Sequence, residues 1–91
     1  MPDVITVQES DTKGRYLHPS GAELTFSKAG ATLRILDHTD VPDTARGQGV
    51  GEQLVAHAVA DARAQGFKLL ALCPFAAATF RKHPEWADVL S

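Results

Sequence analysis

The chain has little of what several protein classes require. Its 91 residues include one cysteine, Cys73, which excludes an internal disulfide framework and a zinc site built from cysteines. The formal net charge of -2 provides no basic footprint for a nucleic acid. No run approaches the roughly 20 apolar residues that span a bilayer, and Met1–Val4 lacks the basic start of a signal peptide. We therefore expect residues 1–91 to form one soluble, cytoplasmic domain that makes no contact with membranes.

Two common phosphate-binding motifs and any metal-ligand pattern are also missing. No Lys-Ser or Lys-Thr pair closes a P-loop, and the dinucleotide fingerprint G-x-G-x-x-G is not matched. No spacing of histidines or carboxylates indicates a metal site. The chain has instead a short glycine loop, Arg46-Gly47-Gln48-Gly49-Val50-Gly51.

This glycine loop lies between the apolar run Ala31–Leu36 and the amphipathic stretch Glu52–Gln65. A strand, a glycine turn and a helix start direct a row of free backbone N–H groups at one point, and the helix dipole adds positive charge there. Glycines allow a bulky anion to approach the backbone. The pattern favours a phosphate or pyrophosphate site, and the alternative is a strand-to-helix turn that binds nothing.

Alternating apolar residues before the loop predict an antiparallel meander. The strands are expected over Val4–Glu9, Gly14–His18, Ala22–Ser27 and Ala31–Leu36. After the loop, a helix is expected to end at Gly66, with one apolar face made of Leu54, Val55, Ala58, Val59 and Ala62. The run Phe67–Leu72 predicts a strand buried on both faces. Short helices are expected over Phe75–His83 and Pro84–Leu90.

A strand–helix–strand connection within one sheet is normally a right-handed crossover between parallel strands. Segments 31–39 and 67–73 would then be parallel, with their C-terminal ends at one edge, where ligands of such sheets bind. This topology predicts that the glycine loop, His38 and Cys73 lie at the same rim, although they are far apart in the sequence.

The spacing Arg46-x-x-Gly49-x-Gly51 resembles the pyrophosphate loop of the GNAT superfamily of acetyltransferases, written Q/R-x-x-G-x-G/A. Three further segments occur in the order found in a family of small, single-domain GNAT-like proteins of about this length: His38-Thr39-x-Val41-Pro42, Leu72-Cys73-Pro74-Phe75 and Arg81-Lys82-His83-Pro84-Glu85. The resemblance covers roughly residues 14–89. Members of this family are often labelled N-acetyltransferases without an assigned substrate.

The resemblance implies an α/β fold in which a meander is followed by a parallel β-loop-α-β unit and short C-terminal helices. It also implies that acetyl-coenzyme A or coenzyme A binds here, on Val41, Arg46, Gly47, Gln48, Gly49, Val50 and Gly51. Larger members build an acceptor pocket from additional helices and strands, for which this chain has no residues. The acceptor side would be open, completed by a second subunit of a homodimer, or suited to a large acceptor such as a protein tail.

In the superfamily an amine attacks the thioester directly, often with a glutamate base and a tyrosine acid. The corresponding strand here carries His38, with Asp37 and Asp40 nearby, and the single tyrosine, Tyr16, lies in the meander. An imidazole titrates near neutral pH, so His38 is a candidate base. The alternative is a histidine that anchors the strand end by a hydrogen bond to the turn.

Cys73 is the second catalytic candidate because it precedes a proline and an expected helix N-terminus, which lowers the pKa of a thiol. It could be a covalent acetyl carrier, the acid that reprotonates the leaving thiolate, or a buried cysteine that fills space. The basic group at residues 81–83 could contact the 3′-phosphate of the coenzyme or form a solvated face. His18 and His57 are expected at the surface.

These observations favour an acetyltransferase that moves an acetyl group from acetyl-coenzyme A to an amine of a small molecule or a protein. The second interpretation is a coenzyme A-binding module with little catalysis. A third is a small interaction domain that keeps the fold without the ligand.

Overall fold

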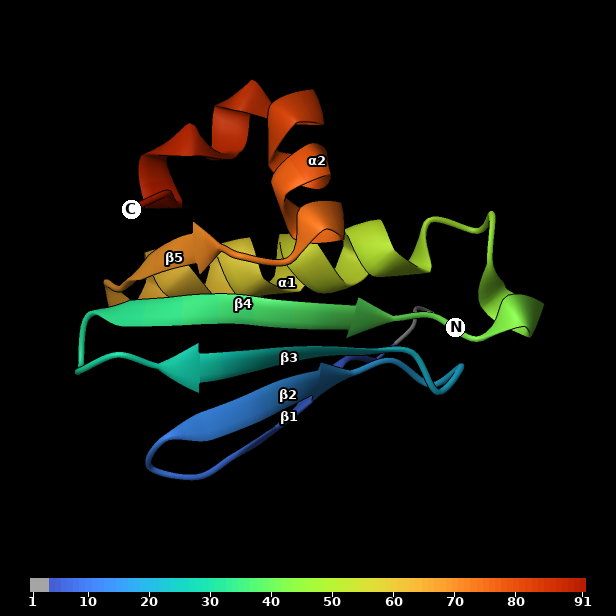
Figure 1. The fold of residues 1–91 in the computed structure, drawn as a ribbon, viewed down its shortest axis with the longest axis horizontal. Coiled ribbons are helices and arrows are strands. Elements are labelled where there is room, and N and C mark those ends of the chain that lie inside the picture. Colours follow the sequence, from blue (N-terminus) through green and yellow to red (C-terminus); the bar gives the residue numbers. More distant parts are fainter. Residues whose placement is uncertain (1–3) are drawn as a thin grey trace.

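The structure is a computed structural model that describes residues 4–91. Residues 1–3, which belong to the expected domain and to the segment tested for a signal peptide, lie outside the described residues. The described chain forms one five-stranded sheet with helices packed against it (Figure 1).

The strands follow one another across the sheet in sequence order. Pairing is antiparallel from β1 to β4 and parallel between β4 and β5. The bounds are β1 Thr6–Glu9, β2 Lys13–Leu17, β3 Glu23–Lys28, β4 Leu33–Asp40 and β5 Lys68–Ala71. The predicted fold class, an antiparallel meander followed by a parallel β-loop-α-β unit, is confirmed.

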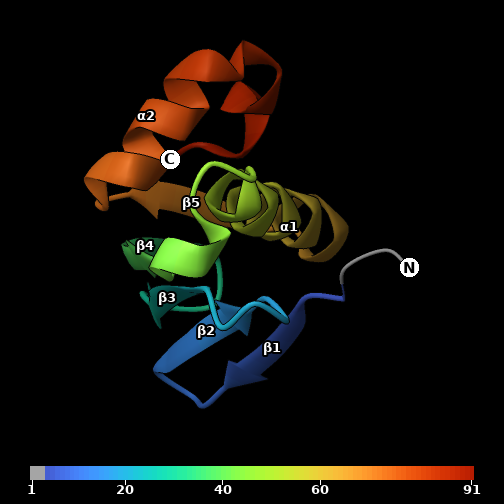
Figure 2. The same cartoon turned by 90° about the vertical axis from the view of Figure 1, so that its right-hand side faces the viewer.

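Helix α1, Val50–Gln65, connects the two parallel strands and covers one face of the sheet (Figure 2). It ends at Gly66, which has φ 80° and donates its N–H to the carbonyl of Ala62, as the sequence predicts. The five apolar residues predicted for its inner face are all buried. They pack against the meander side chains Tyr16, Leu24, Phe26 and Leu36 to form the core.

A β-bulge divides β4 in two. Leu36 lies opposite Phe26, but the next pair is His38 with Thr25, so Asp37 has no partner in β3. An extra residue in one strand exchanges the faces of the residues that follow it. As a result, Leu36 before the bulge and Thr39 after it share the face toward α1, and His38 lies on the other face with Thr25.

Strand β5 is an edge strand with one open face. Leu69 is fully buried toward α1, whereas Leu70 is 42% and Leu72 65% exposed. The prediction of a strand buried on both faces is therefore wrong for this segment, because α1 covers only one of its faces. The apolar composition of 67–72 reflects this exposed leucine pair as well as the core.

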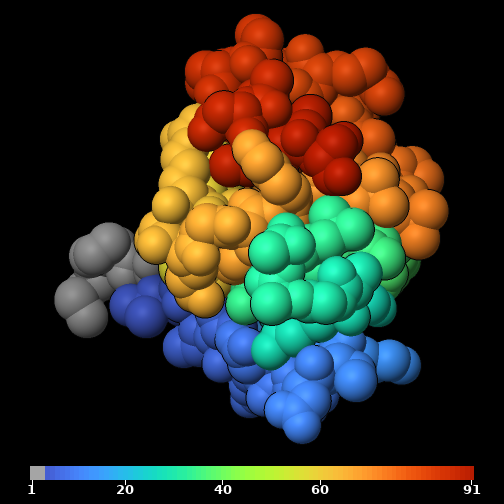
Figure 3. All heavy atoms as spheres, turned by 90° about the vertical axis from the view of Figure 1, so that its left-hand side faces the viewer, coloured from blue at the N-terminus to red at the C-terminus, as the bar shows by residue number. Residues whose placement is uncertain are grey.

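The C-terminal segments lie along the edge of the sheet at β5, and the last residues reach the end where β4 and β5 begin. Helix α2, Pro74–Lys82, leads into the 3-10 helix η2, Pro84–Val89. Leu90 pairs with Leu69, and the N–H of Ser91 donates to the carbonyl of Leu69 at 2.9 Å. Figure 3 looks onto this end, where the last residues of the chain are packed beside the start of β5.

Candidate coenzyme-binding and catalytic site

The candidate site lies where β4 extends beyond β5. The two strands pair only over Leu33–Leu36, and the last contact is the N–H of Cys73 to the carbonyl of Leu36 at 2.9 Å. Beyond that point β4 continues through Asp40 with β3 as its only partner strand, while the chain after β5 turns away into α2 (Figure 1). The second edge of this part of β4 is therefore left without a strand.

A cavity of about 500 Å³ fills this opening. Its walls are residues 38–41 at the end of β4, residues 45–52 apart from Gln48, and three side chains of α2, namely Phe75, Thr79 and Lys82. A cavity of this size falls in the range of about 300–1,000 Å³ that small-molecule sites occupy.

Two glycines of the loop are required by the backbone. Gly47 has φ 79° and Gly49 has φ 74°, a left-handed conformation that disfavours residues with a Cβ atom, and a Cβ at either position would have no atom within 4 Å. Gly49 is also the N-cap of α1, where it offers no side chain to the helix. The first backbone bond into the helix is from Gln53 to Gly49 at 3.0 Å. The N–H groups of the first turn before Gln53 thus have no acceptor inside the helix.

Gly51, the third glycine of the loop, is required for a different reason, which is the close approach of an aromatic ring. A Cβ on Gly51 would lie 2.6 Å from Cζ of Phe75, so the aromatic ring packs directly on the helix backbone. Phe75 is 43% exposed and forms part of the cavity wall. Gly51 therefore determines the position of this wall.

The remaining predicted coenzyme residues divide into two groups. Val41, Val50 and Arg46 line the cavity together with the three glycines. The Arg46 side chain is 72% exposed and pairs with Asp43 at 3.2 Å, so solvent competes with this ion pair. Gln48 does not line the cavity, because its side-chain amide donates to the carbonyl of Thr44 at 3.2 Å.

His38 is exposed and lines the cavity. Within residues 4–91 its ring takes part in no hydrogen bond or ion pair, whereas its backbone carbonyl accepts a hydrogen bond from the Thr25 hydroxyl at 3.3 Å. The hydrogen bond that would make the ring an anchor of the strand end is thus absent. The imidazole is free to contact a ligand from the open face of the sheet.

Cys73 is close to the cavity but does not line it. The side chain is 3% exposed at the N-cap of α2, and its Sγ lies 3.4 Å from Oγ1 of Thr39. Burial raises the pKa of the thiol, but the Thr39 hydroxyl and the backbone amides of Ala76 and Phe75 outweigh it, so that the pKa lies below its ordinary value. The structure brings the loop, His38 and Cys73 to one rim, with Thr39 between the thiol and the cavity.

The sequence alone did not predict the polar cluster that His83, Glu52 and Glu85 form at the rim of the cavity. The His83 ring lies between two carboxylates, with Nε2 2.8 Å from Glu52 and Nδ1 2.9 Å from Glu85, and it stacks on Trp86 at 3.9 Å. The hydrogen bond to Glu85 is the main cause that raises the pKa of His83, and Glu52 raises it further. The Glu85 spacing is visible in the sequence, but Glu52 comes from α1 and needs the fold. Of the predicted basic group 81–83, only Lys82 lines the cavity.

The two other histidines also depart from the sequence expectation. His18 is 7% exposed, so its prediction as a surface residue is wrong, and its Nδ1 lies 2.8 Å from Oγ of Ser20. The half-buried His57 packs edge-on against the ring of Tyr16. Tyr16 itself is fully buried outside the cavity, which leaves Phe75 as the aromatic side chain of the wall.

Neither a metal cluster nor a membrane helix is found in the part of the chain that the structure describes. Residues 4–91 place no group of three or more His, Cys, Asp or Glu side chains where they could hold a metal ion. Among the same residues, every helix is too short or too polar to cross a membrane.

The mixed sheet, the crossover helix and the glycine turn at its start define an α/β protein of the GNAT type. The chain belongs to the GCN5-related N-acetyltransferase family, whose sequence model matches residues 15–89. Both the predicted family and the predicted fold are thereby confirmed. Among curated proteins, none matches the chain.

A solved structure supports the same assignment. It is the solution structure of a GCN5-like protein from Staphylococcus aureus, provisionally described as an N-acetyltransferase. The two chains are 29% identical and superpose with a TM-score of 0.70. The match covers 94% of this chain and 87% of the other.

Proposed function

We propose that the protein transfers an acetyl group from acetyl-coenzyme A to an amine. The observation that carries this proposal is the position of the glycine turn. The unpaired amides at the start of α1 open onto the same cavity as the unpaired edge of β4. One wall therefore suits an anion and the adjoining wall suits an extended chain.

The pyrophosphate of the coenzyme fits the glycine turn. Free N–H groups and the positive end of a 16-residue helix favour a negative charge at this position. Arg46 and Lys82 add two cations that can reach a phosphate from opposite walls. Because Gly47 and Gly49 have no Cβ, a phosphate can approach the backbone closely there.

The amide-containing arm of the coenzyme fits the end of β4. An unpaired strand edge presents alternating N–H and C=O groups, and an extended chain with amide groups can pair with them. Such a chain would run from the glycine turn toward Thr39 and His38, which places the thioester near both residues.

His38 is then the residue that takes the proton of the acceptor. The amine nitrogen attacks the thioester carbonyl, a C–N bond forms, and the imidazole accepts the proton that the nitrogen releases. The C–S bond breaks and coenzyme A leaves as a thiolate. The burial of Cys73 behind Thr39 favours a role as an acid for this thiolate over that of a covalent carrier, since a carrier must contact the carbonyl carbon.

The second candidate function is binding of coenzyme A with little catalysis. It is favoured by one observation: the aromatic residue on the cavity wall is Phe75, which has no hydroxyl to donate a proton. Turnover of acetyl-coenzyme A with a panel of primary amines separates the two. Binding without product formation would leave the binding module.

Thermal unfolding with and without acetyl-coenzyme A tests the shared part of both functions. At about 100 times Kd the ligand stabilises the native state by about 2.7 kcal/mol. A domain of this size gains about 4–8 °C in Tm for each kcal/mol, so we expect a shift of about 10 °C or more.

The matched variants are Gly49→Asp and Gly49→Asn. Both residues tolerate the left-handed conformation at φ 74°, and they differ in charge. The aspartate should remove the Tm shift because it places a carboxylate where phosphate binds, and the asparagine should keep part of it. An undiminished shift in Gly49→Asp would show that the coenzyme does not use the glycine turn.

A further inference from the structure

The buried thiol and the cavity are connected through one hydroxyl group. Cys73 is 3% exposed and does not belong to the cavity wall. Thr39 does line the cavity, and its Oγ1 lies 3.4 Å from Sγ of Cys73. Thr39 therefore contacts both the thiol and the space that a ligand in the cavity would occupy.

The bulge in β4 places this hydroxyl where it is. The extra residue, Asp37, is held by a hydrogen bond from the Ser27 hydroxyl at 2.6 Å. It turns Thr39 onto the face that Leu36 occupies, toward the first turn of α2 and Cys73. The same shift leaves His38 on the opposite face, so the candidate base and the thiol lie on different sides of the strand.

We propose that Thr39 is a proton relay between Cys73 and the departing coenzyme A thiolate. The proposal rests on the transferase function proposed above and assigns a residue to its second half. A hydroxyl can donate one hydrogen bond while it accepts another, which is what a relay between two sulfur atoms requires.

The step balances without any further reactant. As the C–S bond of the thioester breaks, the electron pair stays on the coenzyme sulfur, which takes the proton of the Thr39 hydroxyl. Thr39 in turn takes the proton of the Cys73 thiol, so that the threonine is unchanged and Cys73 becomes a thiolate. Between turnovers, after coenzyme A leaves, a proton from water returns to Cys73 through the same hydroxyl. Nothing is oxidised or reduced.

The surroundings of Cys73 favour this direction of transfer. Its thiolate lies at the N-terminus of α2, where the backbone amides of Ala76 and Phe75 and the helix dipole stabilise a negative charge. The pKa of the thiol is accordingly held below its ordinary value. A thiol with a lowered pKa gives up its proton readily to a thiolate that lacks such stabilisation.

The competing explanation is structural: the contact between Thr39 and Cys73 fastens the end of β4 to α2. The two explanations differ in which substitutions they tolerate. A fastener depends on packing, so the nearly isosteric Thr39→Val should preserve much of it. A relay depends on the hydroxyl, so Thr39→Ser should preserve it and Thr39→Val should not.

The experiment measures kcat, KM for acetyl-coenzyme A, and the coenzyme-induced Tm shift in Thr39→Val, Thr39→Ser, Cys73→Ala and the double variant Thr39→Val/Cys73→Ala. Loss of proton transfer costs about 10²-fold or more in rate, so we expect kcat to fall by about that factor in Thr39→Val with KM and the Tm shift unchanged. Thr39→Ser should stay within several-fold of the native rate.

The double variant should be no slower than the slower single variant, because both residues serve one path. Thr6→Val, on the exposed outer strand, controls for the loss of a threonine elsewhere.

Any one of five results would overturn the relay. Equal losses in Thr39→Val and Thr39→Ser, or a loss of coenzyme binding together with kcat, would make Thr39 a fastener. Additive losses in the double variant would place the two residues on separate paths. A native protein that binds acetyl-coenzyme A but acetylates no amine would remove the relay together with the transferase function, whereas a native rate in Thr39→Val would remove the relay alone.

Discussion

The two halves of β4 share strand β3 as a neighbour on one side. They differ on the other side, where only the first half has a partner strand. Residues 34–36 pair with both β3 and β5, and residues 38–40 pair with β3 alone. The first half carries Arg34 into a closed network of charges, and the second presents His38 and Thr39 to the cavity. One strand therefore contains a buried arginine and, beyond the bulge, two polar residues that line the cavity.

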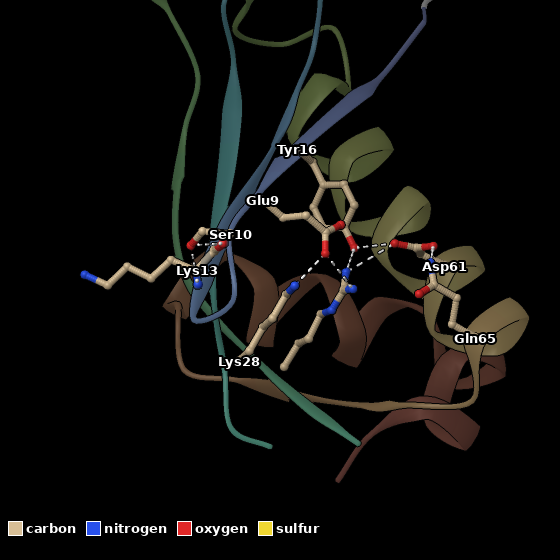
Figure 4. Close-up of polar contacts among 8 residues, drawn as sticks. Glu9, Ser10, Lys13, Tyr16, Lys28, Asp61 and Gln65 are labelled. Atoms are coloured by element: carbon tan, nitrogen blue, oxygen red, sulfur yellow. Dashed lines mark hydrogen bonds and ion pairs between the residues drawn. The ribbon is translucent and has the colours of Figure 1, made fainter. Parts of the chain in front are cut away.

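In the first half of β4, the charge of Arg34 is surrounded by charged and hydrogen-bonding partners. The Arg34 guanidinium lies 3.3 Å from Asp61, 3.0 Å from the Tyr16 hydroxyl and 3.6 Å from Glu9. Figure 4 shows how Tyr16, Asp61 and Glu9 converge, with Lys28 reaching Glu9 from the side. Burial is the main cause that raises the pKa of Tyr16, and Asp61 raises it further, so the phenol stays protonated and donates to Asp61.

Aromatic rings complete this enclosure. The guanidinium carbon lies 4.7 Å from the ring centre of Phe26 and 4.1 Å from that of Phe67, so the cation is held between two ring faces. No buried side-chain nitrogen or oxygen within residues 4–91 lacks a hydrogen-bond partner. In the other half of the strand, the His38 ring and the second backbone edge find no such partners among the residues that the structure describes. The polar groups without partners in this strand therefore lie at the cavity.

The largest expected effect is on stability and comes from replacing Arg34 in the first half of β4. Arg34→Met should lower the free energy of unfolding by about 3–5 kcal/mol, because it removes a buried cation and leaves the half-buried Asp61 carboxylate without it. Urea unfolding measures this, and the Tm shift caused by acetyl-coenzyme A should persist in whatever fraction folds.

Arg15→Met is the matched control, since the Arg15–Glu23 pair at 3.2 Å is partly exposed. Its loss should cost about 0–1 kcal/mol. If both arginine variants cost the same, the enclosure of Arg34 contributes nothing and the contrast between the two halves of β4 fails.

The second prediction concerns the open half. His38→Ala should lower kcat/KM by about 10²-fold, because the acceptor amine loses the group that takes its proton. Stability and the coenzyme-induced Tm shift should hardly change, because the ring fastens nothing. A joint fall in Tm and coenzyme affinity would make His38 an anchor instead of a base.

The third prediction compares the same substitution, glycine to alanine, at Gly14 in β2 and at Gly51 in α1. In Gly14→Ala the new Cβ would lie 2.3 Å from Cζ of Phe26, a ring that is 1% exposed and cannot move aside. We expect a loss of about 1–3 kcal/mol from this overpacking.

In Gly51→Ala the Cβ meets the ring of Phe75, which is exposed enough to swing away. The gain in helix propensity of about 1 kcal/mol should offset the cost of moving the ring, so stability should change by less than about 1 kcal/mol. Chemical unfolding of the two variants side by side gives the comparison, and a larger loss for Gly51→Ala would reverse it.

The smallest expected effect is at the polar cluster of His83, Glu52 and Glu85. The pKa of His83 is raised in the folded state, so its stabilising contribution is fully present below the unfolded pKa of about 6.5 and is lost as pH rises through the folded pKa. His83→Asn should therefore lower Tm more at pH 5.5 than at pH 8.5. A Tm difference that does not vary with pH would mean that the stacking on Trp86, and not the charge, carries the contribution.

The sequence predicts the parts of this molecule that repeat a local pattern. The alternation over Ala22–Ser27, the apolar face of α1 and the stop at Gly66 depend on neighbours within a few residues, and each was found as predicted. The glycine loop is also local, because a strand, a turn and a helix start must follow one another in the chain.

The remainder depends on contacts between distant residues. Alternation alone pairs Leu33 with Ile35 as one face of β4, yet the buried face carries Arg34 and Leu36, because Asp61 of α1 supplies a partner for the cation. The bulge at Asp37 and the contact of Thr39 with Cys73 arise only when β3 and α2 are in place. His83 joins Glu52 across 31 residues for the same reason.

The extra residue in β4 also determines which length changes the strand can tolerate. Side chains alternate between faces with a period of two, so deletion of Asp37 would exchange the faces of every residue from His38 to Asp40 while leaving Leu33–Leu36 as they are. Substitutions in the first half can accumulate without altering this phase. A single-residue deletion or insertion between Leu36 and His38 cannot, and libraries that vary the site should keep the length of this segment fixed.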